Sequence, residues 1–146
     1  IYVGDVKKNR AFCVERTGQR QIKPRSLPED SISVVASRTH GGRRLQHYLE
    51  LIESEFGRVE LKSVGSSLKF CLLAEGIADF YPRLGPTSEW DIGAAQAVLV
   101  AAGGAVQLFN GSSVLYNTKE QLLNPDFMAI SDLQVPWVER LPLLPK

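Results

Sequence analysis

The stretch SISVVASRTHGGRRLQHYLELIESEFG, residues 31–57, decides the fold class. Its first seven residues place apolar side chains close together, as in the buried strands of parallel sheets. After the two glycines, apolar side chains recur at helical spacing on one face, at Leu45, Tyr48, Leu49, Ile52 and Phe56. A glycine follows the last of them and predicts the end of the helix. A buried strand that leads directly into an amphipathic helix is typical of an α/β layer.

The same alternation of strands and helices continues downstream. The segments between turn residues are predicted as strands at residues 59–64, 78–83, 105–109 and 127–131 and as helices at residues 68–74 and 88–102. The sequence therefore predicts an α/β fold with a mostly parallel or mixed central sheet flanked by helices.

The two ends of the chain have a different character. Residues 1–22 contain short β-prone runs that predict a hairpin or meander, with a turn at residues 17–20. Prolines at positions 24 and 28 predict an extended linker after it. We expect residues 1–131 to form one domain. Residues 132–146 hold three prolines and two apolar clusters, and predict a loose tail or a docking segment.

The composition limits the classes of function. Of the 146 residues, 44% are hydrophobic and 23% are charged, which is typical of soluble globular proteins. The net charge of +1 implies no global attraction to nucleic acid polymers or to membranes. The charge is uneven, because residues 1–47 hold ten Lys/Arg and four Asp/Glu, and the remaining residues carry a net charge of −5. The basic region either steers a phosphorylated ligand or is a solvated face.

Cysteine usage and hydropathy bear on location. Cys13 and Cys71 are far apart and form no CxxC spacing, which argues against a zinc site or a disulfide framework and favours a reducing cytosol. No stretch of the sequence is long and apolar enough to span a membrane. The opening IYVGDV lacks the basic and apolar regions of a signal peptide and an initiator Met. We therefore expect a cytoplasmic protein, with peripheral membrane association left open, and a chain that is a fragment.

Polar residues gather at three junctions where expected strands end, and ligands of open α/β sheets bind at such ends. The sequence has no P-loop and no GxGxxG, which disfavours kinases and dinucleotide-binding proteins. The first junction, Ser37-Arg-Thr-His40, offers a cation, hydroxyls and an imidazole to a phosphate or a base edge. The alternative is a polar loop with a solvated arginine.

The other two junctions lie at predicted helix starts. Gly65-Ser-Ser-Leu-Lys69 combines backbone N–H groups, two hydroxyls and a lysine, which favours an anion-binding cradle. The alternative is a serine N-cap with Lys69 pointing to water. In Thr87-Ser-Glu-Trp-Asp91, the carboxylate of Asp91 can bind a hard metal ion. Its alternative is a capping box formed by Ser88 and Asp91.

Together these motifs resemble a known family. Trp90-Asp-Ile-Gly-Ala-Ala95, followed by Ala102-Gly-Gly104, is similar to the second signature of the inositol-monophosphatase-like superfamily. VGSSLKFCLLAEG at residues 64–76, YPRLGPT at residues 81–87 and the first junction resemble the 3′(2′),5′-bisphosphate nucleotidases of bacterial sulfur metabolism. The resemblance covers about residues 1–131.

The resemblance implies a role for each matching position. Asp91 matches a carboxylate that helps to hold catalytic Mg²⁺ near the scissile phosphate. Other positions match contacts to the nucleotide in relatives, and we expect them to bind substrate: Ser37, His40, Ser66, Lys69 and Arg83. The run Gly93-Ala94-Ala95 departs from the small-residue pattern of relatives, which leaves Asp91 in place but can shift helix packing.

The implied reaction removes the 3′-phosphate of adenosine 3′,5′-bisphosphate by in-line attack of a metal-activated water. The family's other metal ligands, a Glu-Glu pair and an Asp-Pro-[Ile/Leu]-Asp-Gly-Thr segment, belong to an N-terminal domain and do not occur in this sequence. We therefore expect a C-terminal domain only, inactive alone, with the missing N-terminal domain as its partner and a tendency to self-associate. The alternatives are an inositol-phosphate or other sugar-phosphate phosphatase of the same superfamily and a non-catalytic module that binds a phosphorylated nucleotide.

Overall fold

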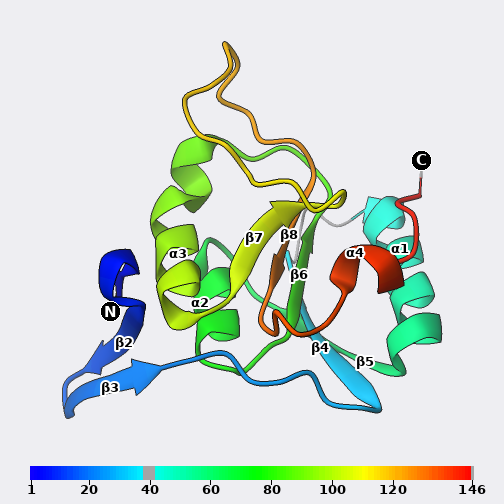
Figure 1. Cartoon of the computed structure of the whole chain (residues 1–146). Helices are drawn as coiled ribbons and strands as arrows, with labels where there is room; N and C mark the ends of the chain where they lie inside the picture. The colour runs from blue at the N-terminus through cyan, green and yellow to red at the C-terminus, as the bar shows by residue number, and fades with distance from the viewer. Residues whose placement is uncertain (38–41, 146) are drawn as a thin grey trace.

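The computed structural model describes residues 1–37 and 42–145, which form two β-sheets and four α-helices (Figure 1). The smaller sheet is an antiparallel meander of β1 (Tyr2–Asp5), β2 (Arg10–Glu15) and β3 (Gly18–Ile22), with the 3-10 helix η1 (Val6–Lys8) before β2. The larger sheet has the strand order β5-β4-β6-β8-β7. Its strands are β4 (Ser31–Ala36), β5 (Arg58–Ser63), β6 (Phe80–Arg83), β7 (Ala105–Leu108) and β8 (Phe127–Ile130).

Helices cover both faces of the larger sheet, as predicted. One face carries α1 (Gly42–Phe56) and the short α4 (Trp137–Arg140), and the other carries α2 (Leu68–Ala74) and α3 (Glu89–Ala102) (Figure 1). All five apolar side chains predicted on one face of the first helix are buried. Within residues 1–37 and 42–145, none of the helices has the length and the apolar character to cross a bilayer.

The larger sheet is mixed, which confirms one of the two predicted sheet types. β5, β4 and β6 run parallel, whereas β8 runs antiparallel to both β6 and β7. β4 lies in the middle of the parallel half, and α1 and α2 lie on opposite faces of the sheet. The carboxyl ends of β4, β5 and β6 therefore meet at one edge, which brings the segments after these strands together.

The turn of the smaller sheet lies earlier than the sequence indicated. The prediction of a turn at residues 17–20 is wrong, because β3 begins at Gly18 and the chain reverses at residues 16–17. β3 is an edge strand, and four of its five residues are exposed. Such a strand needs no apolar alternation, so its polar residues resembled a turn.

The inner face of the smaller sheet packs against α2 and α3. The sheet and α3 approach closely at Gly4 of β1, where a Cβ atom would lie only 2.8 Å from the Cα of Val98 on α3. A side chain at this position would push the strand away from the helix, so glycine is the residue that permits the contact.

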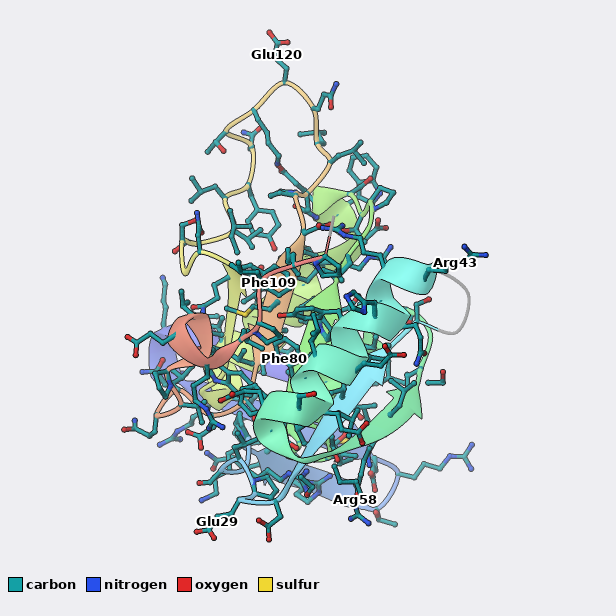
Figure 2. All side chains as sticks on the ribbon, turned by 90° about the vertical axis from the view of Figure 1, so that its right-hand side faces the viewer. Glu29, Arg43, Arg58, Phe80, Phe109 and Glu120 are labelled. Atoms are coloured by element: carbon teal, nitrogen blue, oxygen red, sulfur yellow. The ribbon has the colours of Figure 1, made fainter. Side chains whose placement is uncertain are left out.

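The segment after β8 packs back onto the larger sheet and onto α1. Trp137 is 2% exposed, and its ring stacks on Phe80 and Phe56 with centroid distances of 5.3 and 5.5 Å. Near the end of the described chain, the carbonyl oxygen of Pro145 accepts a hydrogen bond from Nε of Arg44 at 2.8 Å. These contacts give the segment a fixed place beside α1 (Figure 2, where Phe80 is labelled).

A buried carboxylate joins the linker to three strands of the larger sheet. Asp79 is fully buried, and its two oxygens accept hydrogen bonds from Nε and Nη2 of Arg25, each at 2.7 Å. Its Oδ2 also accepts from the backbone N–H of Ser33 at 2.8 Å. The backbone N–H of Asp79 donates to the carbonyl of Ser33, and its own carbonyl accepts from the N–H of Ser131. One residue thus ties the linker to β4, β6 and the end of β8.

Replacement of Arg25 by Met should destabilise the fold, because the carboxylate of Asp79 would stay buried without its counter-charge. Loss of one partner of a buried ion pair typically costs about 3 kcal/mol, and the partial exposure of Arg25 places the expected loss at or below that value. The midpoint of urea unfolding should fall accordingly. Arg16→Met, at the exposed turn between β2 and β3, is the matched control. Equal midpoints for the unchanged chain and Arg25→Met would contradict this role of the ion pair.

Candidate functional site

A cavity of about 440 Å³ lies at the edge where β4, β5 and β6 end. The segments that follow these strands line it, together with the starts of α2 and α3. Its described lining residues are Ser37, Gly65, Ser66, Ser67, Lys69, Phe70, Tyr81, Arg83, Thr87, Asp91 and Ile92. The structure therefore brings five of the six predicted site residues to one cavity. The sixth, His40, lies outside the described residues.

Asp91 lies in the first turn of α3, is exposed, and lines the cavity. Its Oδ2 accepts a hydrogen bond from the backbone N–H of Ser88 at 2.8 Å, as the capping alternative predicted. A carboxylate has two oxygens with about four acceptor sites in total. One cap therefore leaves Asp91 with acceptor capacity for a cation or another donor at the cavity.

The donors at the cavity suit a hard cation in type but not in number. The carboxylate of Asp91 is the kind of oxygen ligand that Mg²⁺ prefers. Among the residues that the structure describes, no group of three or more His, Cys, Asp or Glu side chains could hold a metal ion. This part of the chain offers one carboxylate ligand and does not complete a metal site.

Lys69 stabilises the turn that leads into α2 through hydrogen bonds to its carbonyl oxygens. The residue is 3% exposed, and its Nζ donates to the carbonyl oxygens of Ser66 at 2.8 Å and Val64 at 3.2 Å. The same Nζ lies 5.1 Å from the ring centre of Tyr81. The alternative in which Lys69 points to water is therefore wrong. Burial lowers the pKa of the Lys69 ammonium group, and the positive charge of Arg83 lowers it further.

Ser66 has a backbone conformation that is uncommon for residues other than glycine and asparagine. Its φ is 56°, in the left-handed region, and its Oγ accepts a hydrogen bond from the N–H of Leu68 at 3.4 Å. The bond from Lys69 to the carbonyl of Ser66 helps to hold this conformation. Such residues cost on the order of 1–3 kcal/mol and concentrate at ligand sites. The side chain of Ser66 is exposed at the cavity.

Arg83 ends β6 and fixes the loop that leads to α3. Its Nε donates to the carbonyl of Gly85 at 3.2 Å, and its Nη2 donates to that of Pro86 at 2.7 Å. The cavity is thus lined by two cations, Lys69 and Arg83, held by backbone carbonyls, and by the carboxylate of Asp91. This arrangement suits an anion such as a phosphate ester together with a metal cation.

Thr87 also lines the cavity, although the sequence indicated no separate role for it. Its carbonyl accepts from the backbone N–H of Asn124 at 2.7 Å, and its Oγ1 accepts from Nδ2 of Asn124 at 3.3 Å. Asn124 belongs to the connection between β7 and β8, where the sequence predicted no helix or strand. No periodicity relates positions this far apart, so the contact had no signal in the sequence. Trp90, which directly precedes Asp91 in the first turn of α3, is 72% exposed.

The sequence of this chain is similar to those of known proteins. A model of the inositol monophosphatase family matches residues 3–134. Over 94 residues the chain is 48% identical to the 3′(2′),5′-bisphosphate nucleotidase CysQ of Salmonella typhimurium and 47% identical to that of Escherichia coli K12. Each alignment covers 64% of this chain and 37% of the relative.

A solved structure is also similar. The crystal structure of CysQ from Bacteroides thetaiotaomicron, described as a bacterial member of the inositol monophosphatase family, superposes with a TM-score of 0.66 at 34% identity. The superposition covers 86% of this chain and 55% of that protein. The chain therefore spans about half or less of the length of the relatives that it matches.

The buried ammonium of Lys69 predicts a specific pH dependence. The pKa of Lys69 in the folded chain lies below the ordinary value of 10.5, which applies to the unfolded chain. At a pH between the folded and the unfolded pKa, the unfolded chain therefore binds more protons than the folded chain. The free energy of unfolding should therefore rise with pH through this interval. Lys69→Met has no charge to bury and should lack this rise. In urea titrations, the stability of the unchanged chain minus that of Lys69→Met should increase as the pH is raised from neutrality toward 10.5. A flat or falling difference would contradict a burial cost at Lys69.

Proposed function

The chain belongs to the inositol monophosphatase family, and from this premise we propose that it is part of a Mg²⁺-dependent phosphomonoesterase that acts on a small phosphorylated nucleotide. The proposed reaction removes the 3′-phosphate of adenosine 3′,5′-bisphosphate and gives AMP and phosphate. The observation that carries the proposal is the cavity at the carboxyl ends of β4, β5 and β6, where Asp91 lies with Lys69 and Arg83. The proposal is supported by the aligned relatives named 3′(2′),5′-bisphosphate nucleotidase, to which nearly half of the aligned residues are identical.

Each residue of the cavity has a role in this proposal. Asp91 holds Mg²⁺ with the acceptor capacity that its cap leaves free. Bound Mg²⁺ would stabilise negative charge on the phosphate and lower the pKa of a coordinated water. Arg83 and Lys69 attract and orient the phosphorylated substrate, Arg83 as a planar donor group and Lys69 as a point charge. The remaining predicted positions orient the nucleotide through hydrogen bonds: Ser37, His40 and Ser66.

We further propose that this chain is not catalytically sufficient. Hydrolysis of phosphate monoesters can require acceleration of up to about 10²¹-fold. A single positioned acid or base contributes roughly 10²–10⁴-fold. Mg²⁺ gives up its water reluctantly, and Asp91 alone would bind it weakly. The other metal ligands are therefore proposed to come from polypeptide outside the 146 residues, equivalent to the N-terminal domain of relatives.

The outer face of the smaller sheet supports a related proposal about association. Ile1 is 84% exposed and Val3 is 48% exposed on neighbouring positions of this face, and Phe12 and Val14 are half-buried. Apolar side chains gathered on one surface favour association with another surface. The isolated chain is proposed to self-associate, and a monomer at all concentrations in sedimentation experiments would contradict this.

A non-catalytic module that binds a phosphorylated nucleotide is the second candidate. Asp91 is the single carboxylate among the described residues that line the cavity, which favours this candidate. The two candidates agree on binding and differ on catalysis, so they separate only in a protein that carries the remaining metal ligands.

The isolated chain should bind adenosine 3′,5′-bisphosphate in calorimetry and should release no phosphate from it in the presence of Mg²⁺. Arg83→Met should weaken binding by about tenfold or more, because a hydrogen bond from a charged group contributes roughly 1.5–3 kcal/mol. Arg58→Met removes the same charge at the start of β5, the end opposite the cavity, and should leave binding unchanged. Failure to bind would contradict the nucleotide site, and robust phosphate release would contradict the insufficiency of the chain.

A completed protein, in which this chain is joined to an N-terminal domain with the family's other metal ligands, should hydrolyse adenosine 3′,5′-bisphosphate. It should prefer this substrate to inositol phosphate; the reverse preference would favour the sugar-phosphate alternative. Asp91→Asn keeps an oxygen that can cap Ser88 and loses the charge that binds the cation. We expect it to lower kcat by at least about 100-fold, since even residues behind a metal ligand contribute roughly 10–100-fold. Full activity of Asp91→Asn would exclude a metal role for this carboxylate.

A further inference from the structure

The connection between β7 and β8, residues 109–126, rises beyond the sheet at its cavity edge and returns to the first turn of α3 (Figure 1). Two backbone bonds join it there: the N–H of Asn124 donates to the carbonyl of Thr87 at 2.7 Å, and the N–H of Glu89 donates to the carbonyl of Leu122 at 2.9 Å. Ser88, between them, pairs with Leu123 in an isolated β-bridge. The connection thus forms a short ladder with residues 87–89.

The carboxylate of Glu89 adds a side-chain anchor to this ladder. It is only 7% exposed, and it is not among the described residues that line the cavity. Its Oε2 accepts from the backbone N–H of Asn117 at 2.7 Å, and its Oε1 pairs with Nζ of Lys119. Both oxygens of Glu89 are therefore bound by the connection, about 30 positions further along the chain.

The anchored residues in turn hold the carboxylate of Asp91. The N–H of Ser88 donates to Oδ2 of Asp91, and Ser88 lies between the two residues that the connection binds, Thr87 and Glu89. Lys119 pairs with Glu89, and Glu89 follows Ser88 directly in the chain. The N–H of Ser88 in turn binds Asp91, so the orientation of Asp91 at the cavity depends on this sequence of contacts.

We propose that Glu89 and Lys119 are positioning residues for Asp91. Their ion pair fixes the first turn of α3 so that Asp91 presents its carboxylate to a cation at the cavity. This inference rests on the proposed function, because it requires that Asp91 binds a metal ion. Residues behind a ligand fix its orientation in the same way in other metal sites.

A purely electrostatic role for Lys119 makes the opposite prediction. Lys119 carries a positive charge close to the first turn of α3, and its removal would make the surroundings of Asp91 more negative. Electrostatics alone therefore predicts that Lys119→Met strengthens cation binding at Asp91. Loss of positioning predicts that the same change weakens it. The sign of the effect separates the two roles.

The test uses the ¹⁵N-labelled 146-residue chain and Mn²⁺ as a paramagnetic substitute for Mg²⁺. Broadening of the amide signals of Ser88, Asp91 and Ile92 on titration reports the affinity of the cation, and hydrogen exchange of the Ser88 amide reports the cap without any metal. We expect Lys119→Met and Glu89→Gln to lower the affinity by about tenfold and to speed the exchange of the Ser88 amide. Lys119→Arg retains the ion pair and should restore both.

The matched control is Glu120→Gln, which neutralises the next residue of the same connection. Glu120 is exposed and lies at the tip of the connection (Figure 2), so we expect unchanged affinity and unchanged exchange. Affinity that is unchanged or higher in Lys119→Met would overturn the positioning role alone. Because Asp91 alone binds a cation weakly, the titration extends to Mn²⁺ concentrations at which weak binding is visible. The absence of selective broadening there in the unchanged chain would contradict the metal role of Asp91 and therefore this inference.

Discussion

The buried charge of Asp79 is the constraint on which the rest of the structure depends, because an ionised carboxylate without exposed surface needs its counter-charge inside the chain. Arg25 supplies that charge from the linker, so the smaller sheet and the larger sheet are joined at a defined point. Through its backbone, Asp79 also bonds to Ser33 on β4 and to Ser131 after β8, where the parallel half of the sheet meets the antiparallel half. From there β6 runs to Arg83 at the cavity. Asp79, which carries the structural charge, and Arg83, one of the candidate functional charges, thus lie at opposite ends of β6.

The sequence contained enough information for most of the fold and for the place of the site. Apolar periodicity identified α1 and its buried face, and the convergence of parallel strand ends brought together five residues from three separate segments. The direction of Lys69 had no local signal, because a lysine in the first turn of a helix reaches either water or the preceding carbonyls. Packing above Tyr81 decides between them. The contacts that fix the β7–β8 connection likewise had no signal in the sequence. The pairing of Glu89 with Lys119 depends on the path of an irregular segment in the folded chain.

The cations of the cavity are held in place before any ligand arrives. Lys69 and Arg83 each donate two hydrogen bonds to carbonyls of the loops that form the cavity wall. Charges that are already oriented need little rearrangement when an anion binds, and this is how preorganised sites stabilise negative charge. The burial of Lys69 is the cost of the arrangement, and its lowered pKa is the sign of that cost.

The two tryptophans of the chain occupy opposite environments, and this gives the protein two built-in optical probes. Trp137 is enclosed against Phe56 and Phe80, whereas Trp90 is 72% exposed next to Asp91. A shielded indole emits at shorter wavelength and resists collisional quenchers such as acrylamide, and an exposed indole does neither. A quencher therefore reduces the emission of Trp90 first, and the remaining emission comes from Trp137 in the core. Changes in the first turn of α3 and loss of the packed interior can thus be followed separately in one unlabelled sample.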